Sequence, residues 1–151
     1  MGQQDIAALF VIKEEIKKIN KKNNLHNTFK VDLGNYETAL EFVGSMVFHP
    51  PISKDWSTNP VILCPDLLDY QNKLIIEYEE EVGNRRTGAR LAKKGHNREG
   101  DEDNSRDARR NKFYKRGGFH VVRLWESDKN WEETLENFLK LFEPRDRFNN
   151  H

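Results

Sequence analysis

Three acidic residues in the middle of the chain have the types and the spacing of a metal-binding site. Glu77 and Glu79 lie two positions apart in a run rich in β-branched residues, and Asp66 precedes Glu77 by eleven positions. Side chains alternate between the two faces of a strand, so the two glutamates would share one face while Tyr78 projects from the other. A short turn over residues 69–72 could bring Asp66 alongside them.

Carboxylates that converge at the edge of a hydrophobic core repel one another unless a cation holds them. Oxygen ligands suit a hard cation such as Mg²⁺, for which Mn²⁺ could substitute, and the main-chain carbonyl of Tyr78 could supply a further oxygen. Such a cation activates water and stabilises charge on a scissile phosphate. A Glu-x-Glu pair on a strand is also compatible with an ordinary solvated face, and this alternative stays open.

Basic residues gather in the segment that follows these carboxylates. Residues 83–98 contain six Lys or Arg residues and no acid, and residues 106–116 form a second basic cluster. Lys and Arg neutralise phosphates, and Arg can also read guanine in the major groove. The candidate DNA-binding residues are Arg85, Arg86, Arg90, Lys93, Lys94, His96, Lys112 and Arg116. The alternative is a solvated loop over residues 83–104 that has no partner.

Four segments have helical patterns. Apolar residues at helical spacing predict amphipathic helices over residues 6–19 and 36–47. A third helix, over residues 105–116, is expected to stop at the glycines that follow it. Asn130 and Glu133 have the spacing of a capping box, which predicts the start of a fourth helix.

Three runs rich in β-branched and aromatic residues, 60–66, 73–79 and 119–125, predict strands. The proline-rich segment 49–60 is expected to be a loop. The predicted order is therefore α-α-β-β-α-β-α. This order indicates one α/β domain over residues 1–151, with a mixed central β-sheet and helices on both faces.

The order of these motifs resembles the PD-(D/E)xK nuclease superfamily, and most closely its very-short-patch-repair-like endonucleases and their small stand-alone relatives. In that branch the carboxylate strand is followed by a helix D-x-x-R-x-x-x-L-x-x-x-G and a strand V-x-R-x-W. The residues of this chain that fall in step are Asp107, Arg110, Tyr114, Gly117, Val121, Arg123 and Trp125. The likeness spans roughly residues 36–142 and implies a restriction-endonuclease-like core.

The resemblance implies a Mg²⁺-dependent endonuclease that hydrolyses phosphodiester bonds in double-stranded DNA, with a homing or restriction-type enzyme as one form that it could take. It implies Asp66, Glu77 and Glu79 as catalytic residues and metal ligands. A glutamate of the helix over residues 36–47 would join the site, with Glu41 as the better match and Glu37 as the spare.

The chain departs from the pattern at one position, because Glu79 stands where the superfamily usually has a lysine. Some nucleases of the group carry an acid there. Lys93, Lys94 or His96 could then assist the attacking water. The alternatives are a repair or junction-specific nuclease, and a DNA-binding module that has lost catalysis.

The length and composition of the chain limit its domain number, its location and the way it could bind DNA. The chain has 151 residues, enough for one domain, and its single cysteine, Cys64, excludes an internal disulfide. It has no apolar run long enough to span a membrane and no signal-peptide pattern, so a cytoplasmic or nucleoid-associated protein is expected. With 25 basic and 25 acidic residues, it would not bind DNA by net charge alone. Cutting both strands with so small a chain favours a homodimer.

Overall fold

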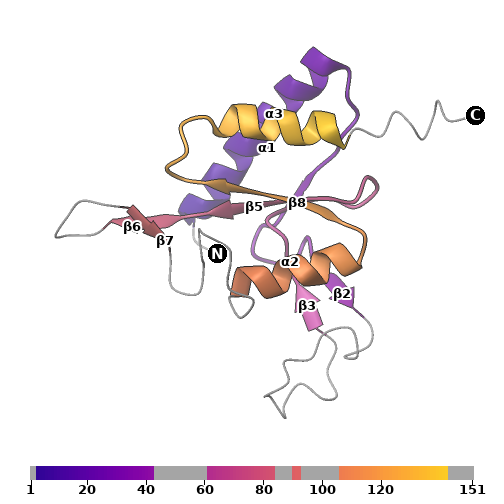
Figure 1. Ribbon diagram of the computed structural model, residues 1–151, viewed down its shortest axis with the longest axis vertical. Coiled ribbons are helices and arrows are strands. Elements are labelled where there is room, and N and C mark those ends of the chain that lie inside the picture. Colours follow the sequence, from indigo (N-terminus) through magenta and orange to yellow (C-terminus); the bar gives the residue numbers. More distant parts are fainter. Residues whose placement is uncertain (1–2, 43–60, 84–89, 93–105, 143–151) are drawn as a thin grey trace, which may run out of the picture.

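The computed structural model describes residues 3–42, 61–83, 90–92 and 106–142, and within these ranges the chain is a three-layer α/β structure. A mixed β-sheet forms the middle layer. Helices α1 and α3 cover one face of this sheet, and α2 covers the other (Figure 1). The predicted mixed sheet with helices on both faces is therefore confirmed.

Three of the four predicted helices are present. They are α1 (Gln3–Asn23), α2 (Arg106–Arg116) and α3 (Trp131–Leu141). The buried stripe of α1 consists of Leu9, Ile12, Ile16 and Ile19, whose spacing places them on one side of the helix. They pack with Leu135, Phe138 and Leu139 of α3 against the sheet.

The ends of α2 and α3 differ in how far they follow prediction. Helix α2 stops at the expected glycines, and Gly118 adopts a left-handed φ of 85° after the last turn. At the start of α3, the side chain of Asn130 makes no capping hydrogen bond within the described part of the chain, so the predicted capping box is wrong. Instead the carbonyl of Asn130 accepts hydrogen bonds from the amide and hydroxyl of Thr134.

The main sheet has the strand order β1-β4-β5-β8. Its strands are β1 (Lys30–Val31), β4 (Leu67–Asp69), β5 (Leu74–Glu79) and β8 (His120–Trp125). Strand β4 runs antiparallel to β5, whereas β8 runs parallel to β5, and α2 lies on the connection between β5 and β8. The strands predicted over residues 73–79 and 119–125 are thus confirmed.

A tight turn over residues 70–73 joins β4 to β5 and sets their register. The buried carboxylate of Asp69 accepts hydrogen bonds from the amide of Thr28, at 3.1 Å, and from the amide and side chain of Asn72, at 3.0 and 2.7 Å. Lys73 completes the turn with a left-handed φ of 61°. The turn expected over 69–72 is therefore present, and it folds the residues before β4 back along β5.

The helix predicted over residues 36–47 is wrong in its described part. Residues 40–42 form β2 (Leu40–Phe42), which pairs antiparallel with β3 (Val61–Leu63). Tyr36 has a φ of 59°, which an α-helix does not accommodate, and its ring is exposed. The buried hydroxyl of Thr38 donates to the carbonyl of Pro65, which ties this segment to the chain before β4. Residues 43–47 and the loop expected over 49–60 lie outside the described residues.

The predicted loop over residues 83–104 is partly a hairpin. Strand β6 (Glu81–Gly83) pairs antiparallel with β7 (Arg90–Ala92). Figure 1 shows this pair extending beyond the end of β5, away from the helices. Each of these two strands has only three residues, so the alternation of polar and apolar residues is too short to predict them from the sequence. The rest of the predicted loop lies outside the described residues.

None of the helices in the described ranges is long and apolar enough to cross a membrane.

Candidate functional site

Strand β5 places Glu77 and Glu79 on the face of the sheet that α2 covers. Both are buried, with 5% and 3% of their surface exposed. Ile75 shares this face and packs against Tyr114 of α2, whereas Leu74 and Ile76 face α1 and α3. The predicted shared face of the two glutamates is confirmed, and both carboxylates lie between the sheet and a helix.

Asp66 lies just before β4 and reaches the backbone of β5. Its Oδ2 accepts a hydrogen bond from the amide of Tyr78 at 2.8 Å. Burial, and next the negative charge of Glu77, raise the pKa of the Asp66 carboxyl well above its usual range. The turn between β4 and β5 thus brings Asp66 and Glu77 together, as the spacing predicts.

The backbone of β5 also directs the carbonyl of Tyr78 toward the side of the strand on which Asp66 lies. The carbonyl of Glu79 accepts a hydrogen bond from the amide of Glu126, at 2.9 Å, beyond the end of β8. Successive residues of a strand point their N–H and C=O groups to opposite sides, so those of Tyr78 point away from β8. They point to the side where Asp66 lies.

Glu77 is the centre of a cluster that we call the Glu77 group: Glu77, Arg110 and Tyr114, which contact one another, and Asp66, whose carboxyl is affected by the charge of Glu77. The hydroxyl of Tyr114 donates to Glu77 Oε1 at 3.0 Å and accepts from Nη2 of Arg110 at 3.0 Å. The same Nη2 lies 3.8 Å from Glu77 Oε1 and donates to the carbonyl of Cys64 at 3.3 Å. Two residues one helical turn apart on α2 therefore contact a single carboxylate of β5.

The neighbouring charges change how these groups titrate. Burial, followed by the charge of Glu77, raises the pKa of Tyr114, so that its hydroxyl stays protonated at neutral pH. Burial opposes the charge of Arg110, but the Glu77 carboxylate, the contact with Tyr114 and the charge of Asp66 together outweigh burial and raise the pKa of Arg110. Burial, together with the charge of Asp32, also raises the pKa of the Cys64 thiol. The cysteine is therefore a thiol and no nucleophilic thiolate at neutral pH.

Glu79 belongs to a second group, the Glu79 group: Glu79, Asn111 and Arg123. Nη1 of Arg123, on β8, forms a salt bridge with Oε1 of Glu79. Nη2 of Arg123 donates to Oδ1 of Asn111, on α2, at 2.8 Å. A fixed cation from the neighbouring strand thus lies against Glu79, which distinguishes it from Asp66 and Glu77.

The three predicted acids are therefore divided between two groups. Across the described residues, no three His, Cys, Asp or Glu side chains are grouped so that they could hold a metal ion by themselves. Asp66 and Glu77 suit a hard cation, because the partly buried Asp66 and the buried Glu77 lie together and the Tyr78 carbonyl is directed to their side. Glu79 would have to leave Arg123 to join them.

The other predicted site residues lie on several elements. Glu41 is on β2, opposite Ile62 in the register, and its side chain lies outside the described residues. Arg90 begins β7. Lys112 and Arg116 are exposed on α2, four positions apart. The remaining candidates, Arg85, Arg86, Lys93, Lys94 and His96, lie outside the described residues.

The sequence does not predict the partners of the acids. Arg110, Tyr114 and Arg123 match motif positions, but their pattern does not indicate which carboxylate each one meets. The spacing of Arg110 and Tyr114, one turn apart on a helix, is a signal that they share a face. Asp32 has no such signal, although its amide donates to the carbonyl of Asp66 at 2.9 Å and its side chain is buried.

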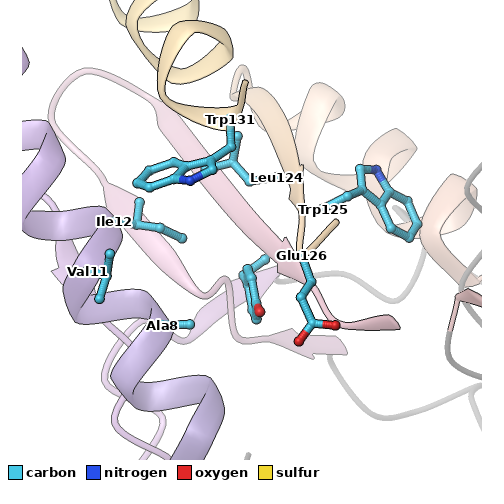
Figure 2. Close-up of a pocket in the computed structure, with 8 residues that line it drawn as sticks. Ala8, Val11, Ile12, Leu124, Trp125, Glu126 and Trp131 are labelled. Carbon is cyan, nitrogen blue, oxygen red and sulfur yellow. The ribbon is translucent and has the colours of Figure 1, made fainter. Parts of the chain in front are cut away.

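A cavity of about 220 Å³ lies on the opposite face of the sheet. It is mostly apolar, and its walls come from α1, from the ends of β5 and β8, and from α3. Figure 2 shows Ile12 and Trp131 at this cavity, whereas the ring of Trp125 points away from them across β8. Tyr78 lines the cavity, and side chains alternate along β5, so Glu77 and Glu79 lie on the other side of the strand. The cavity and the acids are separate features.

Comparisons with protein-family models, with curated proteins and with solved structures found no match to the chain. Function therefore rests on the chemistry of the residues themselves.

Proposed function

We propose that the chain is a Mg²⁺-dependent endonuclease that hydrolyses phosphodiester bonds in double-stranded DNA. The observation that carries this proposal is that the partly buried Asp66 lies beside the buried Glu77. Burial, and next the charge of Glu77, raise the pKa of Asp66, and Arg110 supplies only one positive charge beside the two acids. A divalent cation relieves this repulsion, and an anionic substrate then supplies its remaining ligands.

The ligands in this proposal are the carboxylates of Asp66 and Glu77 and the carbonyl of Tyr78. When bound, the cation would lower the pKa of water and neutralise charge on the scissile phosphate. The protein holds these ligands in place before the substrate arrives: the Tyr78 amide orients Asp66, and the Tyr114 hydroxyl orients Glu77. Glu79 would serve mainly to hold Arg123, and Glu41 would join through a second shell or a second metal.

Basic residues would position the DNA. Lys112 and Arg116 are exposed on the helix that covers the acids. Arg90 starts β7, in the strand pair β6–β7 that follows β5. In this proposal these three act together with Arg85, Arg86, Lys93, Lys94 and His96 on the phosphate backbone. Lys93, Lys94 or His96 would assist the attacking water, and a homodimer would place one site on each strand.

A second candidate function is a DNA-binding module derived from a nuclease that has lost catalysis. The salt bridge between Glu79 and Arg123 favours it, because this bridge occupies the position where the superfamily usually has a lysine. The two candidates differ in cleavage and agree in DNA binding. A restriction, homing or repair role would differ only in the DNA that is cut.

Incubation with supercoiled plasmid in Mg²⁺, in Ca²⁺ and in EDTA separates the candidates. A nuclease nicks the plasmid in Mg²⁺ only, and Glu77→Gln abolishes nicking while DNA binding in Ca²⁺ is kept. The matched control is Glu132→Gln, an exposed acid in the first turn of α3, which should cut like the wild type. Binding without cutting identifies the inactive module. Cutting that persists in EDTA contradicts the metal, and absence of both cutting and binding contradicts both candidates.

A further inference from the structure

Arg110 is the cation of the Glu77 group, and it lies beside the carboxylate of Glu77. Its three polar contacts, to Tyr114, to Cys64 and at longer range to Glu77, all use Nη2. Its Nε is buried and has no hydrogen-bond acceptor among the residues that the structure describes. The side chain keeps 28% of its surface exposed, so solvent reaches part of it.

These contacts involve only one of the three nitrogens of the Arg110 guanidinium. A guanidinium carries five N–H donors in a planar fork, and a buried donor without an acceptor costs free energy. The 3.8 Å separation from Glu77 is longer than a hydrogen bond, and Tyr114 bridges the two groups instead. Arg110 therefore neutralises Glu77 without being locked to it.

The unused donors define what Arg110 could bind. A planar fork of N–H groups matches two oxygens of a phosphate, and arginine binds phosphates in this bidentate manner. A phosphodiester that reaches Asp66 and Glu77 would come within reach of the same guanidinium, because Arg110 already contacts Glu77. The two acids alone would repel that phosphate, so a positive charge beside the acids would reduce this repulsion.

We propose that Arg110 positions the phosphate of the substrate, and that it acts as the counter-charge of Glu77 until a divalent cation and DNA are bound. The inference rests on the proposed function, since it concerns the same acids and the same substrate. It assigns Arg110 different partners in the two states: Glu77 and Tyr114 in the free protein, and a DNA phosphate in the complex.

The proposal predicts opposite effects on metal and DNA. Arg110→Gln removes a positive charge beside the cation site, so Mn²⁺ should bind about tenfold more tightly in the absence of DNA. The same change should flatten the log–log salt dependence of DNA binding by about one unit and slow cleavage by about 100-fold. Glutamine keeps a polar N–H donor but has no charge. A purely structural role for Arg110 would instead weaken the binding of both ligands.

The experiment measures Mn²⁺ binding by calorimetry without DNA, DNA binding in Ca²⁺ over a salt series, and cleavage in Mg²⁺. It compares the wild type with Arg110→Gln, Arg110→Lys and the control Lys140→Gln, an exposed cation on α3, across the sheet from α2. Arg110→Lys keeps the charge and loses the fork. It should bind Mn²⁺ like the wild type but cleave more slowly, and it provides the test if Arg110→Gln does not fold.

The outcomes separate the two proposals. If the wild type binds Mn²⁺ and cuts DNA, while both Arg110 variants cut and bind like the wild type, the role of Arg110 is wrong and the nuclease stands. Weaker Mn²⁺ binding by a folded Arg110→Gln protein also overturns that role. If the wild type itself neither binds Mn²⁺ nor cuts, the proposed function fails, and the role of Arg110 fails with it.

Discussion

Replacing Tyr114 with phenylalanine removes one oxygen atom from the middle of the Glu77 group. The side chain is fully buried, and its hydroxyl joins Glu77 to Arg110 through two hydrogen bonds of 3.0 Å each. Phenylalanine fills nearly the same volume, so the change tests the two hydrogen bonds and leaves the packing of the ring against Ile75 intact.

The expected loss follows from the charges of the partners. A hydrogen bond to a charged group contributes about 1.5–3 kcal/mol. Arg110 lies 3.8 Å from Glu77 and can close part of the gap, so the loss should be smaller than the sum of two such bonds. We therefore expect Tyr114→Phe to lower the free energy of unfolding by about 2–4 kcal/mol. For a chain of this length, this corresponds to a fall of roughly 5–15 °C in Tm.

Thermal and urea unfolding, followed by circular dichroism in EDTA, measure this change. The matched control is Tyr70→Phe, which removes the same atom from a ring that is 60% exposed, and it should change the stability by less than about 0.5 kcal/mol. If the Tyr114→Phe protein has the same Tm as the Tyr70→Phe protein, the hydroxyl of Tyr114 does not join Glu77 to Arg110. The account of the Glu77 group would then be refuted.

Three further perturbations test the rest of the structure. A double-mutant cycle with Glu79→Gln and Arg123→Gln should show a coupling of at least about 1 kcal/mol in urea unfolding, since both side chains are largely buried; additive losses would contradict the salt bridge. Gly118→Ala should cost about 1 kcal/mol in the same assay, because alanine is strained at a φ of 85° although the described residues leave room for its Cβ; an unchanged Tm would contradict this backbone conformation. Asp66→Asn should flatten the pH dependence of Tm in EDTA. The raised pKa of Asp66 means that its protonated form stabilises the fold: this stability is complete below the usual pKa of an aspartate and is lost as the pH rises through the raised value. The wild type should therefore lose Tm as the pH rises from about 4, and an equal loss in the variant would contradict the raised pKa of Asp66.

The elements that the sequence predicts correctly are those whose pattern agrees with their surroundings. Helix α1 repeats Leu9, Ile12 and Ile16 on one side, and the structure buries that side. Strand β5 is buried on both faces, which fits a nearly continuous apolar run interrupted only by its acids. Asp66 meets Glu77 because the turn between β4 and β5 is short and local, so it can be inferred from spacing.

Non-local contacts explain the errors. The apolar spacing over residues 36–47 fits a helix, but the left-handed backbone of Tyr36 and the bond from Thr38 to Pro65 lead the chain into a strand. The partners of the acids depend on how α2 and β8 pack against β5. Spacing alone could not pair Arg123 with Glu79, since the ladder places Arg123 opposite Glu77.

Glu79 and Asp66 raise different questions about function. Glu79 has a full structural explanation, because Arg123 neutralises it and Asn111 orients Arg123. Replacing such a buried ion pair by apolar residues is often neutral or stabilising, so its presence is weak support for a site. Asp66 is explained less fully: its carboxyl accepts a hydrogen bond from the Tyr78 amide, but the fold disfavours its charged form and still places it beside Glu77.

Asp66 therefore carries more of the functional inference than Glu79, although Glu79 is the residue that departs from the nuclease pattern. An inactive descendant would be free to lose Asp66, which costs stability when charged, and it would keep the pair of Glu79 and Arg123. Substitutions in the Glu79 group should consequently report mainly on stability. If the proposed function holds, substitutions at Asp66 should report on metal and substrate, because Arg110 balances one negative charge and a bound cation would compensate for the second.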